Sequence, residues 1–303
     1  MPTIPSPNAV RVERVALLSG SIGVTLSAAL AARLGDVRLT ASGTVLLLSA
    51  LARRGPLRPR DLQQLTGLTS GGTTNQLDRL IARGLVTRSH DAVGNDRRAV
   101  VVALAPTGRR VVDQIAATFI EHADSVRDYL RALEAELAHP QPGSPRVAAA
   151  APEPDDGGSG SRRDPAAPGT LAGDRVLDAL MILSRLGGEL RGVLIAGLRR
   201  EAIVSNEAAI VLGELARGGS RRPRDLGALI GTTSGSTTKL LARLEDAGLV
   251  ALDRGHLEAD RRATIVSLTR RGRRALAVSG AALDERSDAI RGLIRDAAAL
   301  LET

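Results

Sequence analysis

Two short stretches of the sequence combine small hydroxyl residues with polar residues at helical spacing. The first, TSGGTTNQLDRLIARGLV, covers residues 69–86, and the second, TTSGSTTKLLARLEDAGLV, covers residues 232–250. Small residues let a helix approach a duplex closely, and hydroxyls and free backbone N–H groups at a helix start can bind phosphates. Polar side chains one turn later can pair with base edges. This pattern indicates contact with double-stranded DNA.

The two stretches are copies in which only certain positions differ. Shared leucines such as Leu77 and Leu241 recur at helical spacing and are expected in a core. Exposed polar positions change, and Asn75 corresponds to Lys239. Asn and Gln suit adenine, whereas Lys suits guanine or phosphate, so the copies are expected to read different half-sites. The residues expected to face DNA are Ser70, Gly71, Thr73, Thr74, Asn75, Gln76 and Arg79, and then Ser234, Ser236, Thr237, Thr238, Lys239 and Arg243.

A second basic element follows each stretch. The segments DRRAVVVAL and DRRATIVSL each place two arginines at the tip of an expected hairpin. Arginine can enter a narrow minor groove. A solvated charged turn is the alternative interpretation, but recurrence in both copies after a recognition-type helix favours DNA contact. The arginines concerned are Arg97, Arg98, Arg261 and Arg262.

Both stretches belong to a longer duplicated unit. The ungapped match begins at Pro59 and again, 164 residues later, at Pro223. A segment rich in Pro, Gly, Ala and Ser separates the copies and is expected to be a flexible linker. The expected organisation is a first domain at residues 1–138, a linker at 139–170 and a second domain at 171–303.

Each copy shows the same expected order of elements. A hairpin follows two short helices joined by a tight turn, which is the order of a winged helix-turn-helix. Thr40 or Ser42 is the expected N-cap of the helix before this unit. Thr69 or Ser70, and Thr233 or Ser234, are the expected caps of the recognition helices. The expected helices cover residues 9–35, 40–54, 107–138, 172–200 and 271–301, with short helices starting at Pro59 and Pro223.

Composition limits the function classes. The chain has no cysteine, which excludes disulfides, thiolate catalysis and Cys-ligated zinc, and fits a reducing cytoplasm. Its net charge of +8 favours anionic partners. The uncharged segment Val15–Ala32 resembles a secretory signal or a membrane anchor when taken alone. Its copy carries Arg185, Glu189 and Arg191, which favours a helix buried inside the protein and no membrane contact.

The two copies resemble the multiple-antibiotic-resistance regulator (MarR) family. The family wing reads Asp-x-Arg, then a strand, then Leu-Thr-x-x-Gly. The second copy fits this pattern, whereas the first has Ala105 at the Thr position, with Thr107 as an alternative helix cap. The resemblance implies that Arg98 and Arg262 enter the minor groove. It also implies that Asp96 and Asp260 brace the wings, against Arg79 and Arg243.

Members of the family are usually homodimers paired through their first and last helices. The resemblance therefore implies a mainly α fold with small β-wings: two tandem winged helix-turn-helix domains arranged as a single-chain pseudo-dimer. Intramolecular pairing of the repeats would replace homodimerisation, with Val15–Ala32 in the interface. Family members often bind phenolic or other aromatic compounds near these helices, which makes Phe119, His122 and Tyr129 candidate ligand residues. Heptad packing is the alternative interpretation of their spacing.

Enzyme activity, a cofactor and a metal are not expected. The four histidines do not recur between copies, and an ordinary polar wing explains His256, Glu258 and Asp260 better than a metal site. Three functions are open: a sequence-specific cytoplasmic transcription regulator, of repressor type, on an imperfect palindrome; a non-specific architectural DNA binder; and a ligand sensor without DNA binding. The divergent recognition helices favour the first, and the wing arginines argue against the third.

Overall fold

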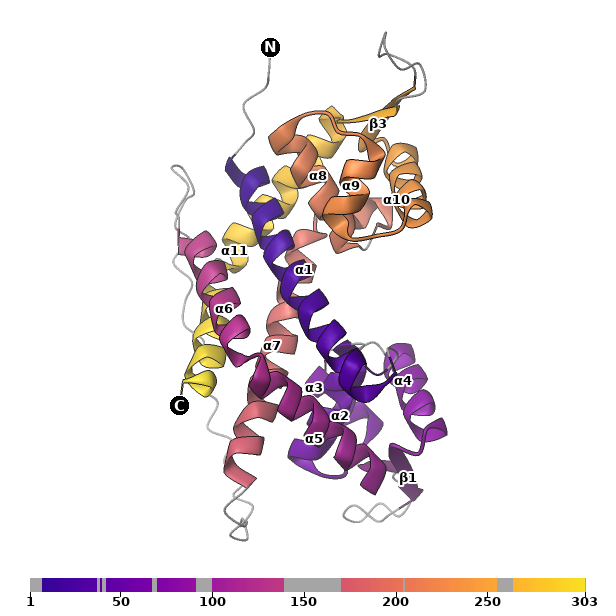
Figure 1. The fold of residues 1–303 in the computed structure, drawn as a ribbon, viewed down its shortest axis with the longest axis vertical. Coiled ribbons are helices and arrows are strands. Elements are labelled where there is room, and N and C mark those ends of the chain that lie inside the picture. The colour runs from indigo at the N-terminus through magenta and orange to yellow at the C-terminus, as the bar shows by residue number, and fades with distance from the viewer. Residues whose placement is uncertain are drawn as a thin grey trace.

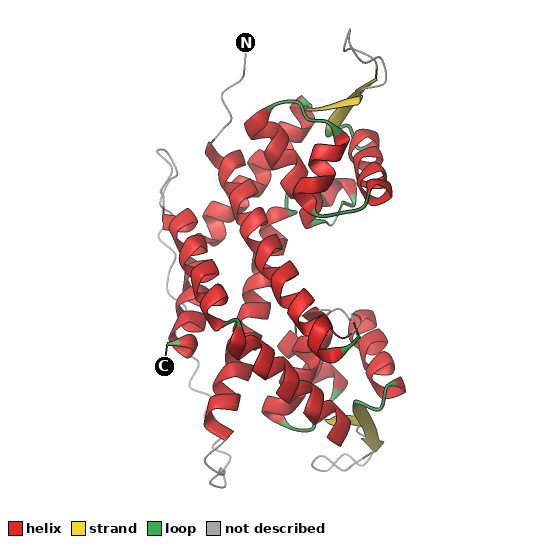
Figure 2. Cartoon of the chain, viewed as in Figure 1, coloured by secondary structure: helices red, strands yellow, loops and turns green. Residues whose placement is uncertain are grey.

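The protein has two helical lobes held at opposite ends of a spine of long helices (Figure 1). The computed structural model describes residues 7–36, 39, 42–66, 70–90, 100–138, 170–203, 205–254 and 264–302. Within these residues, the strands form one small antiparallel hairpin in each lobe, at the two ends of the molecule (Figure 2). The expected mainly α fold with two winged helix-turn-helix units is confirmed.

The first repeat supplies one lobe and part of the spine. We call α2, α3, α4, β1 and β2 the first lobe; the spine receives α1, α5 and α6 from this repeat. The bounds are α1 (Pro7–Leu34), α2 (Ser42–Arg54), α3 (Pro59–Thr66), α4 (Ser70–Ala82), β1 (Val86–His90), β2 (Val100–Leu104), α5 (Pro106–Glu121) and α6 (Ala123–Ala138).

The second repeat has the same order of helices and strands, except that one long helix replaces α5 and α6. A 3-10 turn, η2, follows its first helix. We call α8, α9, α10, β3 and β4 the second lobe. The bounds are α7 (Thr170–Leu194), η2 (Arg199–Glu201), α8 (Asn206–Gly218), α9 (Pro223–Ile230), α10 (Ser234–Asp246), β3 (Val250–Arg254), β4 (Thr264–Leu268) and α11 (Arg270–Leu301).

The expected single helix over residues 107–138 is wrong, because the helix is interrupted at His122. The backbone N–H of His122 bonds to the carbonyls of both Thr118 and Phe119, and its imidazole Nδ1 lies 2.9 Å from the Thr118 carbonyl. The corresponding residue of the unbroken α11 is Arg286, which instead pairs with Glu189 on α7 at 2.5 Å. The break thus coincides with hydrogen bonds of His122 to carbonyls of its own helix, whereas Arg286 pairs with a neighbouring helix.

Each first helix spans both repeats. The N-terminal part of α1 packs Val12, Val15 and Ala16 into the core that contains the second lobe, whereas Leu30 near its other end joins the core of the first lobe. The helix α7 does the reverse, since Leu177 packs in the first-lobe core and later α7 residues in the other. The two repeats thus share their hydrophobic cores.

Glycine positions let the last helices cross the wings closely. A Cβ on Gly108 would lie 2.0 Å from the Leu85 carbonyl oxygen, and one on Gly272 would lie 2.3 Å from the Leu249 carbonyl oxygen. The expected capping role of Thr107 is wrong. The N-cap of α5 is Ala105, which has no side-chain hydrogen bond, and the Thr107 hydroxyl donates to the Gly84 carbonyl.

The expectation that Val15–Ala32 is buried is wrong over most of its length. Buried positions within it are Val15, Ala16 and Leu30, while Val24 is 71% exposed. The helix crosses between the lobes, where Ser19, Gly23 and Ser27 line the interior cavity and Gly20 lies near Ile210. The span Val10–Leu34 is long and apolar enough to cross a bilayer. These properties are only weak evidence for a membrane span, because core helices of soluble proteins and signal sequences share them.

Candidate DNA interface and interior cavity

The two recognition helices lie on the same side of the molecule, at its opposite ends. In Figure 1 both α4 and α10 form the edge that faces away from α6 and the C-terminal part of α11. Each is the second helix of its helix-turn-helix unit and follows a short helix that begins with proline. This arrangement presents two helices of major-groove width in one direction.

The first recognition helix presents a small and polar face. Its side-chain burial follows the helical period, so that residues one turn apart share an environment. Thr73 is 2% exposed because it lies one turn before the core residue Leu77, so the expected DNA contact of its side chain is wrong. The predicted residues on the exposed face are Ser70, Gly71, Thr74, Asn75 and Arg79.

The two residues predicted to read bases, Asn75 and Gln76, differ in exposure. Asn75 is exposed, whereas Gln76 is half-buried, and its Oε1 lies 3.5 Å from the donating hydroxyl of Thr44 on α2. Leu240 occupies the position of Gln76 in the second repeat and packs against the core. Gln76 is thus turned toward α2, and Asn75 is the better base-reading candidate.

The second recognition helix is capped as expected at Thr233, whose side-chain oxygen accepts a hydrogen bond from the Ser236 N–H at 3.3 Å. Thr237 is 3% exposed and its hydroxyl donates to the Thr233 carbonyl at 3.0 Å, so its expected DNA contact is also wrong. The hydroxyl of Thr238 donates to the Ser234 carbonyl. The exposed predicted residues are Ser234, Ser236, Thr238, Lys239 and Arg243.

The wings are described up to the ends of their strands. The first hairpin closes at the pair His90 and Val100, and the second at Arg254 and Thr264. A bridge from Leu57 to Val102 ties the first hairpin to the segment before α3, and Arg221 makes the same bridge to Val266. The predicted tip residues lie outside the described residues: Asp96, Arg97, Arg98, Asp260, Arg261 and Arg262, together with His256 and Glu258.

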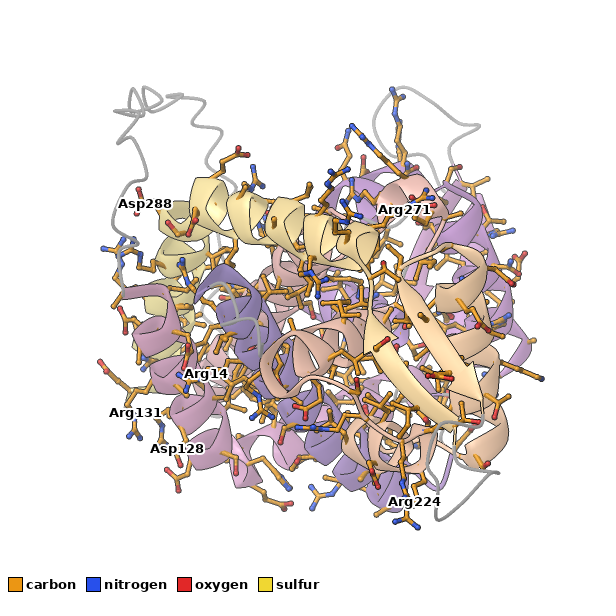
Figure 3. The ribbon with its side chains drawn as sticks, turned by 90° about the horizontal axis from the view of Figure 1, so that it is seen from above. Arg14, Asp128, Arg131, Arg224, Arg271 and Asp288 are labelled. Atoms are coloured by element: carbon orange, nitrogen blue, oxygen red, sulfur yellow. The ribbon has the colours of Figure 1, made fainter. Side chains whose placement is uncertain are left out.

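Sequence reasoning missed two basic residues beside the recognition helices. Arg60 and Arg224 occupy the second position of α3 and α9, and both are exposed. Arg224 projects from the edge of the ribbon in Figure 3 and pairs weakly with Asp225 at 3.3 Å. The first helix of a helix-turn-helix crosses the DNA backbone, so these side chains are candidate phosphate contacts. The duplicated sequence PRDL was the available signal.

A cavity of about 400 Å³ lies between the first lobe and the spine. Residues of α1, α2, α5, α6 and α7 line it, together with Thr66 of α3 and Asn206 of α8, and most of the lining side chains are apolar. The predicted ligand residues Phe119 and Tyr129 are in this lining, whereas His122 is not and binds the Thr118 carbonyl instead. Burial raises the pKa of Tyr129, whose hydroxyl lies 3.4 Å from that of Ser19. The described residues contain no cluster of side chains suited to a metal ion.

Comparisons with known proteins bear on the duplicated unit. A model of the MarR family matches residues 39–99 and again residues 204–263. A solved structure, a transcriptional regulator from Thermotoga maritima, is 26% identical, with 38% of this chain and 87% of that chain covered and a TM-score of 0.28. No curated protein matches the chain.

Proposed function

Because the chain belongs to the MarR family of transcription regulators and carries the matching domain twice, we propose that it binds one double-stranded DNA operator with both repeats at once. The observation that carries this proposal is the pair of recognition helices exposed on one side of the molecule (Figure 1). Paired helices of this kind enter successive major grooves, roughly 34 to 36 Å apart. The small exposed residues at the start of each helix support close approach to the duplex.

The proposed operator is an imperfect palindrome. The first repeat presents Asn75 where the second presents Lys239, and both side chains are exposed. A homodimer carries the same recognition helix twice, whereas a fused chain can differ between its halves. The half-site under α4 is expected to favour adenine at the contacted position, and that under α10 to favour guanine or to rely on phosphate contact.

The proposed pairing is intramolecular. The shared hydrophobic cores support it, since α1 packs on the second lobe and α7 on the first. The proposed domains are residues 1–138 and 171–303 with a linker at 139–170. Wing residues Arg97, Arg98, Arg261 and Arg262 are proposed minor-groove contacts, with Asp96 and Asp260 bracing them.

The proposed mode is repression in the cytoplasm. The described residues form two winged helix lobes and a helical spine. A protein of this architecture that occupies an operator would repress transcription by blocking access of RNA polymerase to the DNA. Regulation by a small aromatic or phenolic ligand is a second proposal, which the cavity beside Phe119 and Tyr129 supports. A ligand wedged between the first lobe and the spine would change the angle at which α4 meets DNA.

Selection from random duplexes tests sequence-specific binding. The wild-type protein is expected to enrich a two-part site, and Asn75→Lys to change the preferred bases in one half only, with discrimination of about 1–3 kcal/mol per good contact. The matched control is Ser125→Lys, which adds the same charge at an exposed position of α6, away from the recognition helices. Binding without site enrichment would support an architectural role, and no binding would support a sensor without DNA function.

A further inference from the structure

The two first helices cross the opposite lobes with unlike side chains at corresponding positions. On α1, Glu13 is buried against α8 and is 1% exposed. On α7, the corresponding residue is Leu177, which is 6% exposed and packs in the first-lobe core. One crossing is therefore built around a buried carboxylate and the other around an apolar side chain.

The second lobe has both the space and the charges that Glu13 needs. A Cβ on Gly213 would lie 2.5 Å from the Cβ of Glu13, so α1 approaches α8 only because glycine stands there. The Glu13 carboxylate accepts hydrogen bonds from Arg217 Nε at 3.2 Å. Glu214, also buried, pairs with Arg217 and with Arg221, the latter at 2.7 Å. We call Glu13, Glu214, Arg217 and Arg221 the pairing network.

The first lobe has neither the glycine nor the acidic residue that surround Glu13 in the second lobe. The counterparts of Gly213 and Glu214 on α2 are Ser49 and Ala50, and both are fully buried. Arg53, the counterpart of Arg217, pairs with Asp178 on α7 at 2.8 Å and with Asp174 at 3.7 Å. The apolar Leu177 and the acidic Asp178 thus suit the surface that α2 offers.

We propose that these contacts form a pairing code that makes α1 dock on the second repeat and prevents it from docking on the first repeat of another copy of the chain. In such a homotypic pair, Glu13 would meet the Ser49 side chain where Gly213 leaves room. Arg53 would also meet Arg14, which occupies the position of Asp178, so an attraction would become a repulsion. Buried charge placed without its partner is strongly unfavourable.

The pairing code supplies selectivity between partners, which a linker does not supply. A linker raises the local concentration of one repeat around the other but cannot distinguish correct from incorrect contacts. Unpaired charge and steric conflict do distinguish them, which is how interfaces exclude wrong partners. This inference rests on the proposed intramolecular pairing, and its test does not depend on DNA binding.

Exchange of the code between the two first helices tests the inference. The helix-exchanged variant carries Glu13→Leu, Arg14→Asp, Leu177→Glu and Asp178→Arg, which leaves the composition unchanged. Each repeat then suits a second copy of itself, so light scattering should show a shift from the 31.5 kDa chain toward a two-chain particle as concentration rises. The matched control adds Ser49→Gly, Ala50→Glu, Leu57→Arg, Gly213→Ser, Glu214→Ala and Arg221→Leu, which exchanges the lobe residues as well and should restore the single chain.

Cross-linking reports which helices meet, because the chain has no cysteine of its own. A Cβ on Gly20 would lie 3.7 Å from Ile210 Cδ1, so Gly20→Cys with Ile210→Cys should react with a short bifunctional maleimide within one wild-type chain. Gly20→Cys with Leu46→Cys, the corresponding position of the first lobe, should cross-link between chains only in the helix-exchanged variant.

Two results would overturn the pairing code. One is a helix-exchanged variant that stays a single chain at all concentrations and keeps the wild-type cross-link. The other is loss of helical circular dichroism in both the helix-exchanged variant and its compensated control, because the control restores every proposed match. Loss of structure in the helix-exchanged variant alone, with a monomeric control, supports the code.

Discussion

The two repeats have the same order of elements but differ at the places where they meet. The first repeat interrupts its last helix at His122 and lines a cavity with Phe119 and Tyr129. It receives α7 through the buried Leu177 and through ion pairs of Arg53 with Asp174 and Asp178. The second keeps α11 continuous and receives α1 through two buried carboxylates, Glu13 and Glu214, that pair with partly exposed arginines. The two lobes therefore keep the same order of elements, whereas the residues around them differ between the repeats.

The largest expected effect breaks the crossing that depends on glycine. Gly213→Ala would place a Cβ 2.5 Å from Glu13 Cβ and force α1 away from α8. We expect a loss of about 1–3 kcal/mol in the free energy of unfolding, measured by urea titration. The matched change in the first lobe is Ser49→Ala, which removes a buried hydroxyl without a partner and should change stability little. Equal effects of the two changes would remove the distinction between the crossings.

A smaller effect is expected from the caps of the last helices. Thr269 accepts a hydrogen bond from the Gly272 N–H at 3.0 Å, and its hydroxyl donates to the Gly248 carbonyl at 2.7 Å. Thr269→Ala should cost about 1 kcal/mol of unfolding free energy. Ala105→Thr should stabilise the first repeat by less, because Thr107 already binds the corresponding Gly84 carbonyl. A destabilising Ala105→Thr would show that the first wing does not accept the second repeat's geometry.

The smallest expected effect is a pH dependence at the α1–α8 crossing. Burial raises the pKa of Glu13, and the neighbouring Glu214 adds to this. Burial opposes ionisation of Glu214 too, but hydrogen bonds from Arg221 and with Glu13 outweigh it and lower its pKa. The two carboxyls therefore have opposite signs of linkage to folding.

A raised folded-state pKa contributes stability below the unfolded value of 4.5, which is lost as the pH rises through the folded-state pKa. The free energy of unfolding of Glu13→Gln should therefore rise relative to wild type as the pH increases above 4.5. Glu214→Gln should show the opposite trend, because a lowered pKa contributes stability above 4.5 that is lost on acidification. Parallel trends for the two variants in urea titrations at several pH values would contradict this assignment.

The sequence predicted the lobes well because their signals are local. Proline at the start of a short helix, a capping threonine, leucines at helical spacing and β-branched strands each act within a few residues, and duplication allowed each to be checked twice. The same helical spacing of the leucines could also have predicted that the side chains of Thr73 and Thr237 point into the core. The half-buried position of Gln76 was not, since it depends on Thr44 of another helix.

The long helices of the spine were predicted, but their side-chain contacts were not, because these contacts join residues that are distant in sequence. Glu13 and Arg217 are 204 residues apart, and neither residue type indicates a buried partner. The exposure of most of Val15–Ala32 follows from the distance between the lobes, which no local pattern contains. The break lies at His122, whose imidazole contacts the Thr118 carbonyl of its own helix, and the residue type alone does not indicate this contact.

The central claim is that one chain supplies both halves of the DNA-binding unit. It is tested most directly by the mass of the complex formed with a selected operator duplex, measured by light scattering with excess duplex and with excess protein. The account predicts one 31.5 kDa chain per duplex under both conditions. A complex that requires two chains per duplex would contradict it.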